Sequence, residues 1–285
     1  MNRSRLSALV WIGSAVLFSI TTAPVHADDA NAHYRLALSH KREGRVDQAL
    51  DEARIAIRLR PDYVAAHLTV GTLLRDQGKL GPALEAYSAA RELDPDNQRA
   101  LALEGVTLMR LGRFEEAIIP LSRAVDLDRS DTTSAANLGS ALRQTDRVNE
   151  AITVMSAGLH ANPTDLGLLN NLAVALRAER RYDEAVLMLL EAINNHPSEH
   201  RVHLNLAISL RSLHRYREAV PYYRRAIELG SDEPGALFDL GVCHEQLGQT
   251  EQAIETYERY VTLIAGQDSA AAERGRKLIE QLRGT

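Results

Sequence analysis

An alanine recurs every 34 residues along most of this chain. The seven alanines follow one another without a gap or an insertion: Ala49, Ala83, Ala117, Ala151, Ala185, Ala219 and Ala253. A unit of this length is a single supersecondary element that cannot bury its own apolar face, so successive units must stack on one another. The period therefore predicts an elongated array of repeats that presents surface rather than an enclosed catalytic pocket.

Each repeat has the sequence features of two helices joined by a tight turn. With Ala30 counted as place 1 of the first repeat, place 8 is small in every repeat: Ala37, Gly71, Gly105, Gly139, Ala173, Ala207 and Gly241. Small residues let two helix backbones approach closely. A glycine turns the chain between the helices in four repeats, namely Gly44, Gly78, Gly112 and Gly248. A proline ends the second helix in four, namely Pro61, Pro95, Pro163 and Pro197. The predicted repeats are 30–63, 64–97, 98–131, 132–165, 166–199, 200–233 and 234–267, within a repeat region 28–267.

The second repeat carries the fullest version of the pattern, which reads Gly71, Leu74, Gly78, Ala83, Tyr87, Ala90 and Pro95. In these residues and their equivalents, over about five-sixths of the chain, the sequence resembles the tetratricopeptide repeat (TPR) family. The resemblance implies an all-α fold, a right-handed superhelical solenoid of seven helix-turn-helix units with a concave channel for extended peptides. One departure is Glu104, which stands at place 7, where the other repeats have leucine or valine. We expect Glu104 to pair with a nearby arginine or to mark a locally shifted helix face.

Residues 268–285 lie outside the repeats and have a helical pattern of their own. Three consecutive alanines, residues 270–272, are followed by Leu278, Ile279 and Leu282 at helical spacing, with polar residues in between. The segment is therefore predicted to be a C-terminal capping helix that covers the open face of the last repeat.

The first 27 residues have the parts of a secretory signal peptide. Arg3 and Arg5 precede an apolar run over residues 6–20, and small residues stand at Val25 and Ala27. Cleavage after Ala27 predicts a periplasmic or secreted protein with no membrane segment. The apolar run is shorter than the ~20 residues that cross a bilayer comfortably, and an uncleaved membrane anchor is the alternative.

Composition argues against several classes of function. The formal net charge is −5, and loss of the first 27 residues leaves 31 basic against 38 acidic residues, a net charge of −7. A mildly acidic chain is not expected to bind nucleic acid. No phosphate-binding loop, nucleophile elbow or two-histidine zinc helix stands in the sequence, so we expect neither an enzyme nor a cofactor, and no catalytic residue.

Two further features invite a chemical role, and for each we favour a structural one. His196, His200 and His203 are close in sequence, but Pro197 places the first two across a turn. We therefore expect structural histidines and no metal site. Cys243 is the only cysteine, which rules out an internal disulfide, and it is expected to be a small buried hydrophobe.

Places 6 and 12 of the first helix supply the candidate binding residues. At 100° per residue, place 6 falls opposite the core face of the helix and place 12 on the edge of that stripe. Place 6 reads Arg35, Thr69, Leu103, Asn137, Asn171, Asn205 and Asp239. Place 12 reads Lys41, Arg75, Met109, Arg143, Arg177, Arg211 and Glu245. The three consecutive asparagines are similar to the asparagine ladder in the repeat region of protein O-linked N-acetylglucosamine transferases, whose catalytic domain has no counterpart here.

These two rows predict how a peptide would be held. An amide offers both a donor and an acceptor, so Asn137, Asn171 and Asn205 are suited to a peptide backbone. The guanidinium groups of Arg143, Arg177 and Arg211 would attract carboxylates. Two alternatives stay open: hydrogen bonding between repeats alone maintains the asparagines, or the arginines are ordinary solvated helix surface.

The sequence thus predicts an exported, non-enzymatic TPR scaffold or adaptor that binds an extended or acidic protein segment in its concave groove. One alternative is a self-associating structural protein of the cell envelope. Another is an accessory subunit of a polysaccharide or secretion machine whose enzyme is another chain.

Overall fold

The computed structural model describes the backbone of residues 23–230 and 233–284, and the side chains of these residues from Asp28 onward. The predicted signal segment lies almost entirely outside these residues. Within them the chain forms fifteen helices and no strand. The helices are α1 (Ala23–Arg42), α2 (Val46–Leu59), α3 (Val64–Asp76), α4 (Leu80–Leu93), α5 (Gln98–Arg110), α6 (Phe114–Leu127), α7 (Thr132–Gln144), α8 (Val148–Ala161), α9 (Leu166–Ala178), α10 (Tyr182–Asn195), α11 (His200–Ser212), α12 (Tyr216–Glu228), α13 (Pro234–Gln246), α14 (Thr250–Ile264) and α15 (Ser269–Arg283).

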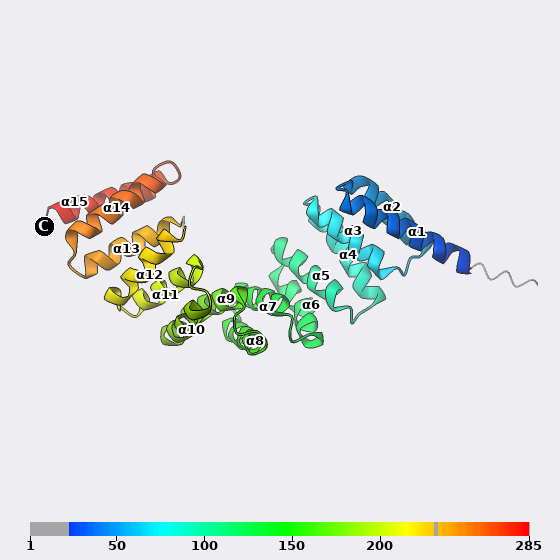
Figure 1. Cartoon of the computed structure of the whole chain (residues 1–285), viewed down its shortest axis with the longest axis horizontal. Helices are drawn as coiled ribbons and strands as arrows, with labels where there is room; N and C mark the ends of the chain where they lie inside the picture. The colour runs from blue at the N-terminus through cyan, green and yellow to red at the C-terminus, as the bar shows by residue number, and fades with distance from the viewer. Residues whose placement is uncertain (1–22, 231–232, 285) are drawn as a thin grey trace, which may run out of the picture.

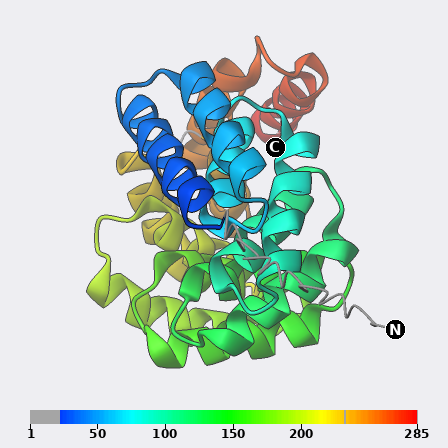
Figure 2. The same cartoon turned by 90° about the vertical axis from the view of Figure 1, so that its right-hand side faces the viewer.

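The helices stack in chain order, and the stack curves into an arch (Figure 1). The two ends, α1 with α2 and α14 with α15, stand on the same side of the middle repeats, as the second view also shows (Figure 2). α15 packs on α14 and buries Ala271, Ala272, Gly275 and Ile279. The C-terminal helix therefore covers the last repeat.

The first helix of each repeat lies on the inner side of the arch in its middle part, where α7 and α9 face the hollow and α8 and α10 lie outside (Figure 1). The contacts between repeats also distinguish the first helices from the second. Successive first helices touch one another in the pairs α5–α7, α7–α9, α9–α11 and α11–α13, whereas neighbouring second helices do not pack on one another to a comparable extent in the described chain. Because elements on the inside of a curve are closer together, the first helices form its inner face.

The two helices of a repeat are held close by one small and one large residue. A Cβ atom added to Gly71 on α3 would lie 2.5 Å from the ring of Tyr87 on α4, and one added to Gly139 on α7 would lie 2.5 Å from Met155 on α8. Such contacts are shorter than real Cβ atoms make, so the large side chain occupies the space that the glycine leaves. The close approach predicted from place 8 is therefore present in these repeats.

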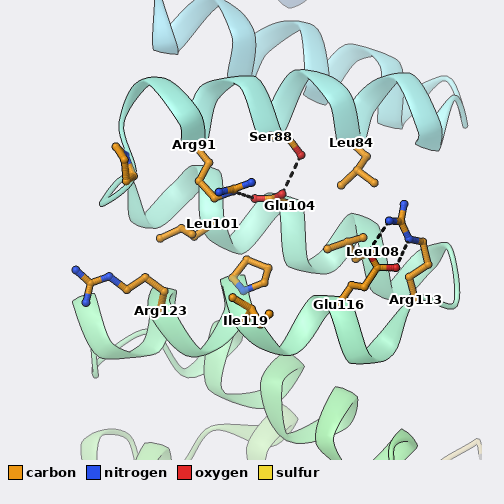
Figure 3. Close-up of a pocket in the computed structure, with 12 residues that line it drawn as sticks. Leu84, Ser88, Arg91, Leu101, Glu104, Leu108, Arg113, Glu116, Ile119 and Arg123 are labelled. Atoms are coloured by element: carbon orange, nitrogen blue, oxygen red, sulfur yellow. Dashed lines mark hydrogen bonds and ion pairs between the residues drawn. The ribbon is translucent and has the colours of Figure 1, made fainter.

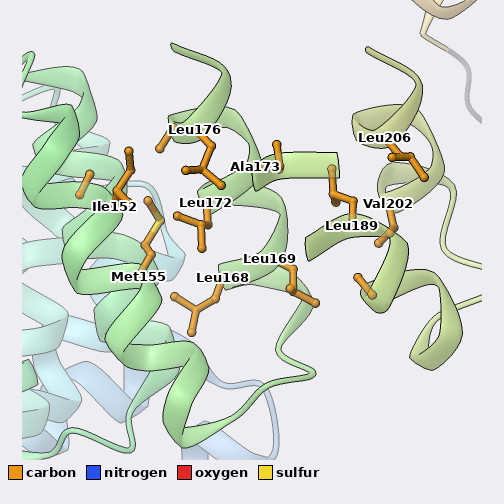
Figure 4. Close-up of a cluster of buried hydrophobic side chains, with 14 of the residues drawn as sticks. Ile152, Met155, Leu168, Leu169, Leu172, Ala173, Leu176, Leu189, Val202 and Leu206 are labelled. Atoms are coloured by element: carbon orange, nitrogen blue, oxygen red, sulfur yellow. The ribbon is translucent and has the colours of Figure 1, made fainter. Parts of the chain in front are cut away.

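Leucine-rich layers join one repeat to the next. On α9, Leu168, Leu172 and Leu176 are buried next to Met155 of α8, while Leu189 of α10 packs on the other side (Figure 4). Full burial of one such side chain stabilises the fold by about 1.5–3 kcal/mol. Because each layer contains residues from two repeats, most of this stabilisation depends on stacking and not on any single repeat.

Cys243 on α13 is fully buried, as predicted, and has no disulfide partner. Burial raises the pKa of its thiol to about 12, so the reactive thiolate is absent at neutral pH.

The turn between the helices requires a left-handed residue in every repeat. Gly78 has φ 75°, and its neighbour Lys79 donates its N–H to the Leu74 carbonyl at 2.9 Å, which is a Schellman ending of α3. In repeats four to six the same place holds a residue with a side chain: Asp146 (φ 61°), Arg180 (φ 57°) and His214 (φ 59°). These three turns adopt the glycine geometry without glycine and are strained.

We predict that Arg180→Gly stabilises the protein by about 0.5–1 kcal/mol, because glycine adopts this backbone conformation without a steric penalty. The side chain of Arg180 is exposed and makes no hydrogen bond or ion pair with the described residues, so little else is lost. Urea unfolding followed by circular dichroism measures the change. Arg180→Ala is the matched control, since it removes the same charge but keeps Cβ; an equal gain in both variants would contradict backbone strain as the cause.

Candidate peptide-binding site

The six predicted binding residues lie on three consecutive inner helices. Asn137 and Arg143 are on α7, and the next two repeats bring Asn171 and Arg177 on α9 and Asn205 and Arg211 on α11. All six are partly buried. Because α7, α9 and α11 touch one another, the two rows run continuously across repeats four to six.

The three asparagines are not equivalent. Asn205 donates from Nδ2 to Oδ1 of Asn170 at 2.8 Å and accepts from Nη1 of Arg177 at 2.7 Å. Asn170 stands at place 5 of the preceding repeat, so this amide joins repeats five and six. Asn137 and Asn171, in contrast, make no side-chain hydrogen bond with any other described residue. Hydrogen bonding between repeats thus accounts for Asn205 but not for Asn137 and Asn171.

The arginines differ in the same way. Arg143 has no ion pair or side-chain hydrogen bond within the described chain. Arg177 contacts only the neutral amide of Asn205, and its pKa is lowered, mainly by burial and further by the like charge of Arg211. A partly buried guanidinium without a counter-ion is unfavourable, and a carboxylate from outside would relieve that cost.

Arg211 already has a carboxylate partner. Its Nε lies 3.4 Å from Oδ2 of Asp239 and 3.3 Å from the hydroxyl of Tyr223, which donates to Asp239 at 3.1 Å. Burial acts to lower the pKa of Arg211, but Asp239 and Tyr223 outweigh it and the pKa is raised. Burial also raises the pKa of Asp239, more than Arg211 and Tyr223 lower it. Asp239 was not among the predicted binding residues, although it occupies place 6 of repeat seven, the repeat after that of Asn205.

Two of the three histidines that suggested a metal site bind backbone carbonyls instead, and the third, His200, lies 3.7 Å from the carboxylate of Glu199. His196 Nε2 lies 2.7 Å from the Thr164 oxygen, and His203 Nε2 lies 2.9 Å from the Pro197 oxygen. His67 makes the same contact with Pro61 at 2.9 Å. Among the residues with described side chains, no group of three His, Cys, Asp or Glu residues is close enough together to hold a metal ion.

None of the helices within the described ranges combines the length and the apolar character needed to cross a membrane.

A second hollow lies on the outer side, between the second helices α4 and α6, with α5 as its floor (Figure 3). This cavity of about 440 Å³ contains Glu104, which accepts from Arg91 Nε at 2.6 Å and from Ser88 Oγ at 2.8 Å. The predicted pairing of Glu104 with an arginine is confirmed.

The other charged groups of this outer cavity are also paired. Arg113 bonds Glu116 at its rim, and Arg123 bonds Asp96. A similar cavity of about 430 Å³ lies between α8 and α10 and has Leu172 in place of Glu104. Since the charged groups of these two outer cavities are paired and several polar groups of the inner face are not, we place the candidate site on the inner face.

The comparisons with known proteins agree with this architecture. The sequence profile of the family described as Tetratricopeptide repeat matches residues 34–81, 68–132, 136–200 and 204–272. The chain therefore belongs to the tetratricopeptide repeat family. The predicted all-α repeat solenoid is confirmed, and solenoids of this family generally serve as interaction scaffolds rather than catalysts.

Three solved structures illustrate the likeness of fold. A tetratricopeptide repeat protein from Parabacteroides merdae is 16% identical, with a TM-score of 0.64 over 89% of this chain and 99% of its own. YrrB, described as a TPR protein with an unusual peptide-binding site, is 21% identical, with a TM-score of 0.56 over 61% of this chain and 90% of its own. MamA from Desulfovibrio magneticus RS-1 is 19% identical, with a TM-score of 0.55 over 61% of this chain and 98% of its own. No curated protein sequence matches the chain.

We predict different effects for the two ways of removing the ion pair between buried Glu104 and Arg91. Arg91→Gln leaves the Glu104 carboxylate buried without its cation and destabilises the fold by about 1–3 kcal/mol, at the lower end because the Arg91 side chain is 39% exposed. Glu104→Leu, which introduces the residue found at place 7 in repeats four to seven, is neutral or stabilising. Chemical denaturation measures both. Equal losses in the two variants would contradict this account.

Proposed function

We propose that this protein is an exported, non-enzymatic scaffold that binds an extended, acidic segment of another protein along its inner face. Asn137 and Asn171 hold the backbone of that segment, with Asn205 fixing the geometry between repeats five and six. Arg143 and Arg177 supply the positive charge along the row, whereas Arg211 at its end already has Asp239 as its carboxylate partner.

The observation that carries this proposal is the pair of unbonded amides at the same place in adjacent repeats. Asn137 and Asn171 each offer a donor and an acceptor, and neither is bonded by another described side chain. The peptide unit needs one of each, so a stacked pair of amides can hold consecutive parts of an extended chain without reading its side chains. The resemblance to the asparagine ladder of the O-linked N-acetylglucosamine transferases supports the same assignment.

Charge supports the acidic character of the partner. Arg143 has no counter-ion in the described chain, and Arg177 has only a neutral amide as its partner. Carboxylates are their natural ligands, because a guanidinium can donate two parallel hydrogen bonds to one carboxylate. YrrB, a relative in fold, is described as having a peptide-binding site, which is consistent with a peptide as ligand.

We predict that the double variant Asn137→Ala/Asn171→Ala binds the partner roughly five- to hundredfold more weakly, since each lost hydrogen bond is worth about 0.5–1.5 kcal/mol. Its melting temperature stays unchanged, because neither side chain bonds the rest of the described chain. A photo-crosslinking residue at Gln144, which is exposed and lies about two turns after Asn137 on the same side of α7, identifies the partner, and titration with the captured segment then measures affinity.

Asn194→Ala is the matched control, because Asn194 is exposed on the outer helix α10 and has no side-chain hydrogen bond with the described residues. A crosslinker at Asn194 likewise should not capture the partner. Asn205→Ala, in contrast, should lower the melting temperature, since it breaks the bonds to Asn170 and Arg177. Unchanged affinity in the double variant would remove Asn137 and Asn171 from the site.

Export is part of the proposal and rests on residues 1–27, of which 1–22 lie outside the described residues. Amino-terminal sequencing of the protein recovered from the cell envelope should read Asp28-Asp29. A start at Met1 in that fraction would instead support an uncleaved anchor.

Self-association is a second candidate, favoured by two large apolar side chains on the outer face. Ile119 on α6 is 76% exposed and Leu187 on α10 is 70% exposed, at the same place of repeats three and five. Such residues occur at contacts between copies of a chain. Sedimentation velocity over a range of concentrations separates a monomeric scaffold from a self-assembling one.

A further inference from the structure

The guanidinium at place 12 of one repeat reaches the place-6 side chain of the next. Arg177 on α9 bonds Asn205 on α11 at 2.7 Å, and Arg211 on α11 lies 3.4 Å from Asp239 on α13. The two pairs have the same separation in sequence. In these two pairs the arginine at place 12 is contacted by the place-6 residue of the next repeat.

The partner of the place-12 arginine differs from repeat to repeat along the inner face. Arg143 has no partner within the described chain, Arg177 has a neutral amide, and Arg211 has the carboxylate of Asp239. One repeat further on, place 12 holds Glu245, which accepts from Tyr257 at 2.9 Å. The inner face thus passes from an unpaired cation in repeat four to paired and acidic groups in repeats six and seven.

Asp239 occupies the position in which a bound carboxylate would meet Arg211. It is partly buried, and Tyr223 donates to the same oxygen that faces Arg211. An incoming acidic side chain would have to approach a neutralised guanidinium and a fixed negative charge at once, which is unfavourable.

We propose that Asp239 acts as an internal carboxylate that closes the acid-binding part of the groove after Arg177 and so sets the register of the bound segment. This rests on the proposed function and deepens it. The partner segment places its acidic residues over α7 and α9, whereas neutral or basic residues lie over α11 and α13. Asp239 is a specificity-determining residue in this scheme, and it acts through Arg211.

The test uses the processed protein and two fluorescently labelled peptides, one of alternating glutamate and serine and one of alternating glutamine and serine. Fluorescence anisotropy at low ionic strength measures binding, because salt screens contacts between exposed charges. Asp239→Asn frees Arg211 while it keeps an acceptor for Tyr223. We expect this variant to bind the glutamate peptide about two- to fivefold more tightly and the glutamine peptide equally well.

Glu255→Gln is the matched control for Asp239→Asn. Glu255 is exposed on the outer helix α14 of the same repeat, so its change alters the net charge equally but leaves the inner face intact. Its affinity should equal that of the parent protein. The gain from Asp239→Asn should also disappear in an Arg211→Gln background, which tests coupling between the two residues directly.

Two outcomes separate this inference from the proposed function. If Arg143→Gln weakens binding of the glutamate peptide but Asp239→Asn does not tighten it beyond the Glu255→Gln control, Asp239 does not close the groove and the proposed function stands. If neither the parent protein nor Asp239→Asn prefers the glutamate peptide, this result contradicts both the proposed function and the inference about Asp239. If Asp239→Asn fails to fold, the remaining comparison is Arg143→Gln with Arg211→Gln, and equal losses of affinity would overturn the inference.

Discussion

The contact between a small residue on the first helix and a large residue on the second determines the spacing on which the whole arch depends. Where Gly71 meets Tyr87 and Gly139 meets Met155, the glycine leaves room for the large side chain and no space for anything else. This contact fixes the two helices as one rigid unit. Leucines such as Leu172 then attach each unit to the one before it. Because the same small–large contact recurs in repeats two, three, four and seven, equivalent side chains of successive first helices come into line on the inner face.

The ends show what such stacking requires. Place 7 packs against the second helix of the preceding repeat, as Glu104 does on α4. Its counterpart in the first repeat, Leu36, is 47% exposed, because no described second helix precedes α1. At the other end, α15 covers the face of α14 that a further repeat would otherwise cover, with small residues such as Gly275 against Val261 and Tyr260. Part of the apolar surface of each repeat is therefore buried only by its neighbours.

Periodicity made the fold predictable, because one spacing repeated seven times constrains every helix at once. It also found the pairing of Glu104, since a lone acidic residue at a leucine place needs a cation. It did not reveal that Asp146, Arg180 and His214 adopt left-handed turns, because their residue types do not require that conformation. Nor did it separate Asn205 from Asn137 and Asn171. That difference depends on Asn170 and Arg177, whose distances to Asn205 follow from how two repeats pack and not from the period.

The distribution of satisfied and unsatisfied polar groups argues that the inner row is more than a structural device. If the amides served only to join repeats, each would find a partner, as Asn205 does in Asn170 and Arg177. In repeats six and seven the polar side chains of the two rows do have partners: Arg211 pairs with Asp239, and Glu245 accepts from Tyr257. In repeats four and five several do not. Their open amides and unpaired guanidinium are adjacent, stand on neighbouring helices and carry complementary hydrogen-bonding capacity. An interaction surface for a polar, negatively charged chain requires such a cluster of amide and guanidinium groups that have no partner within the protein.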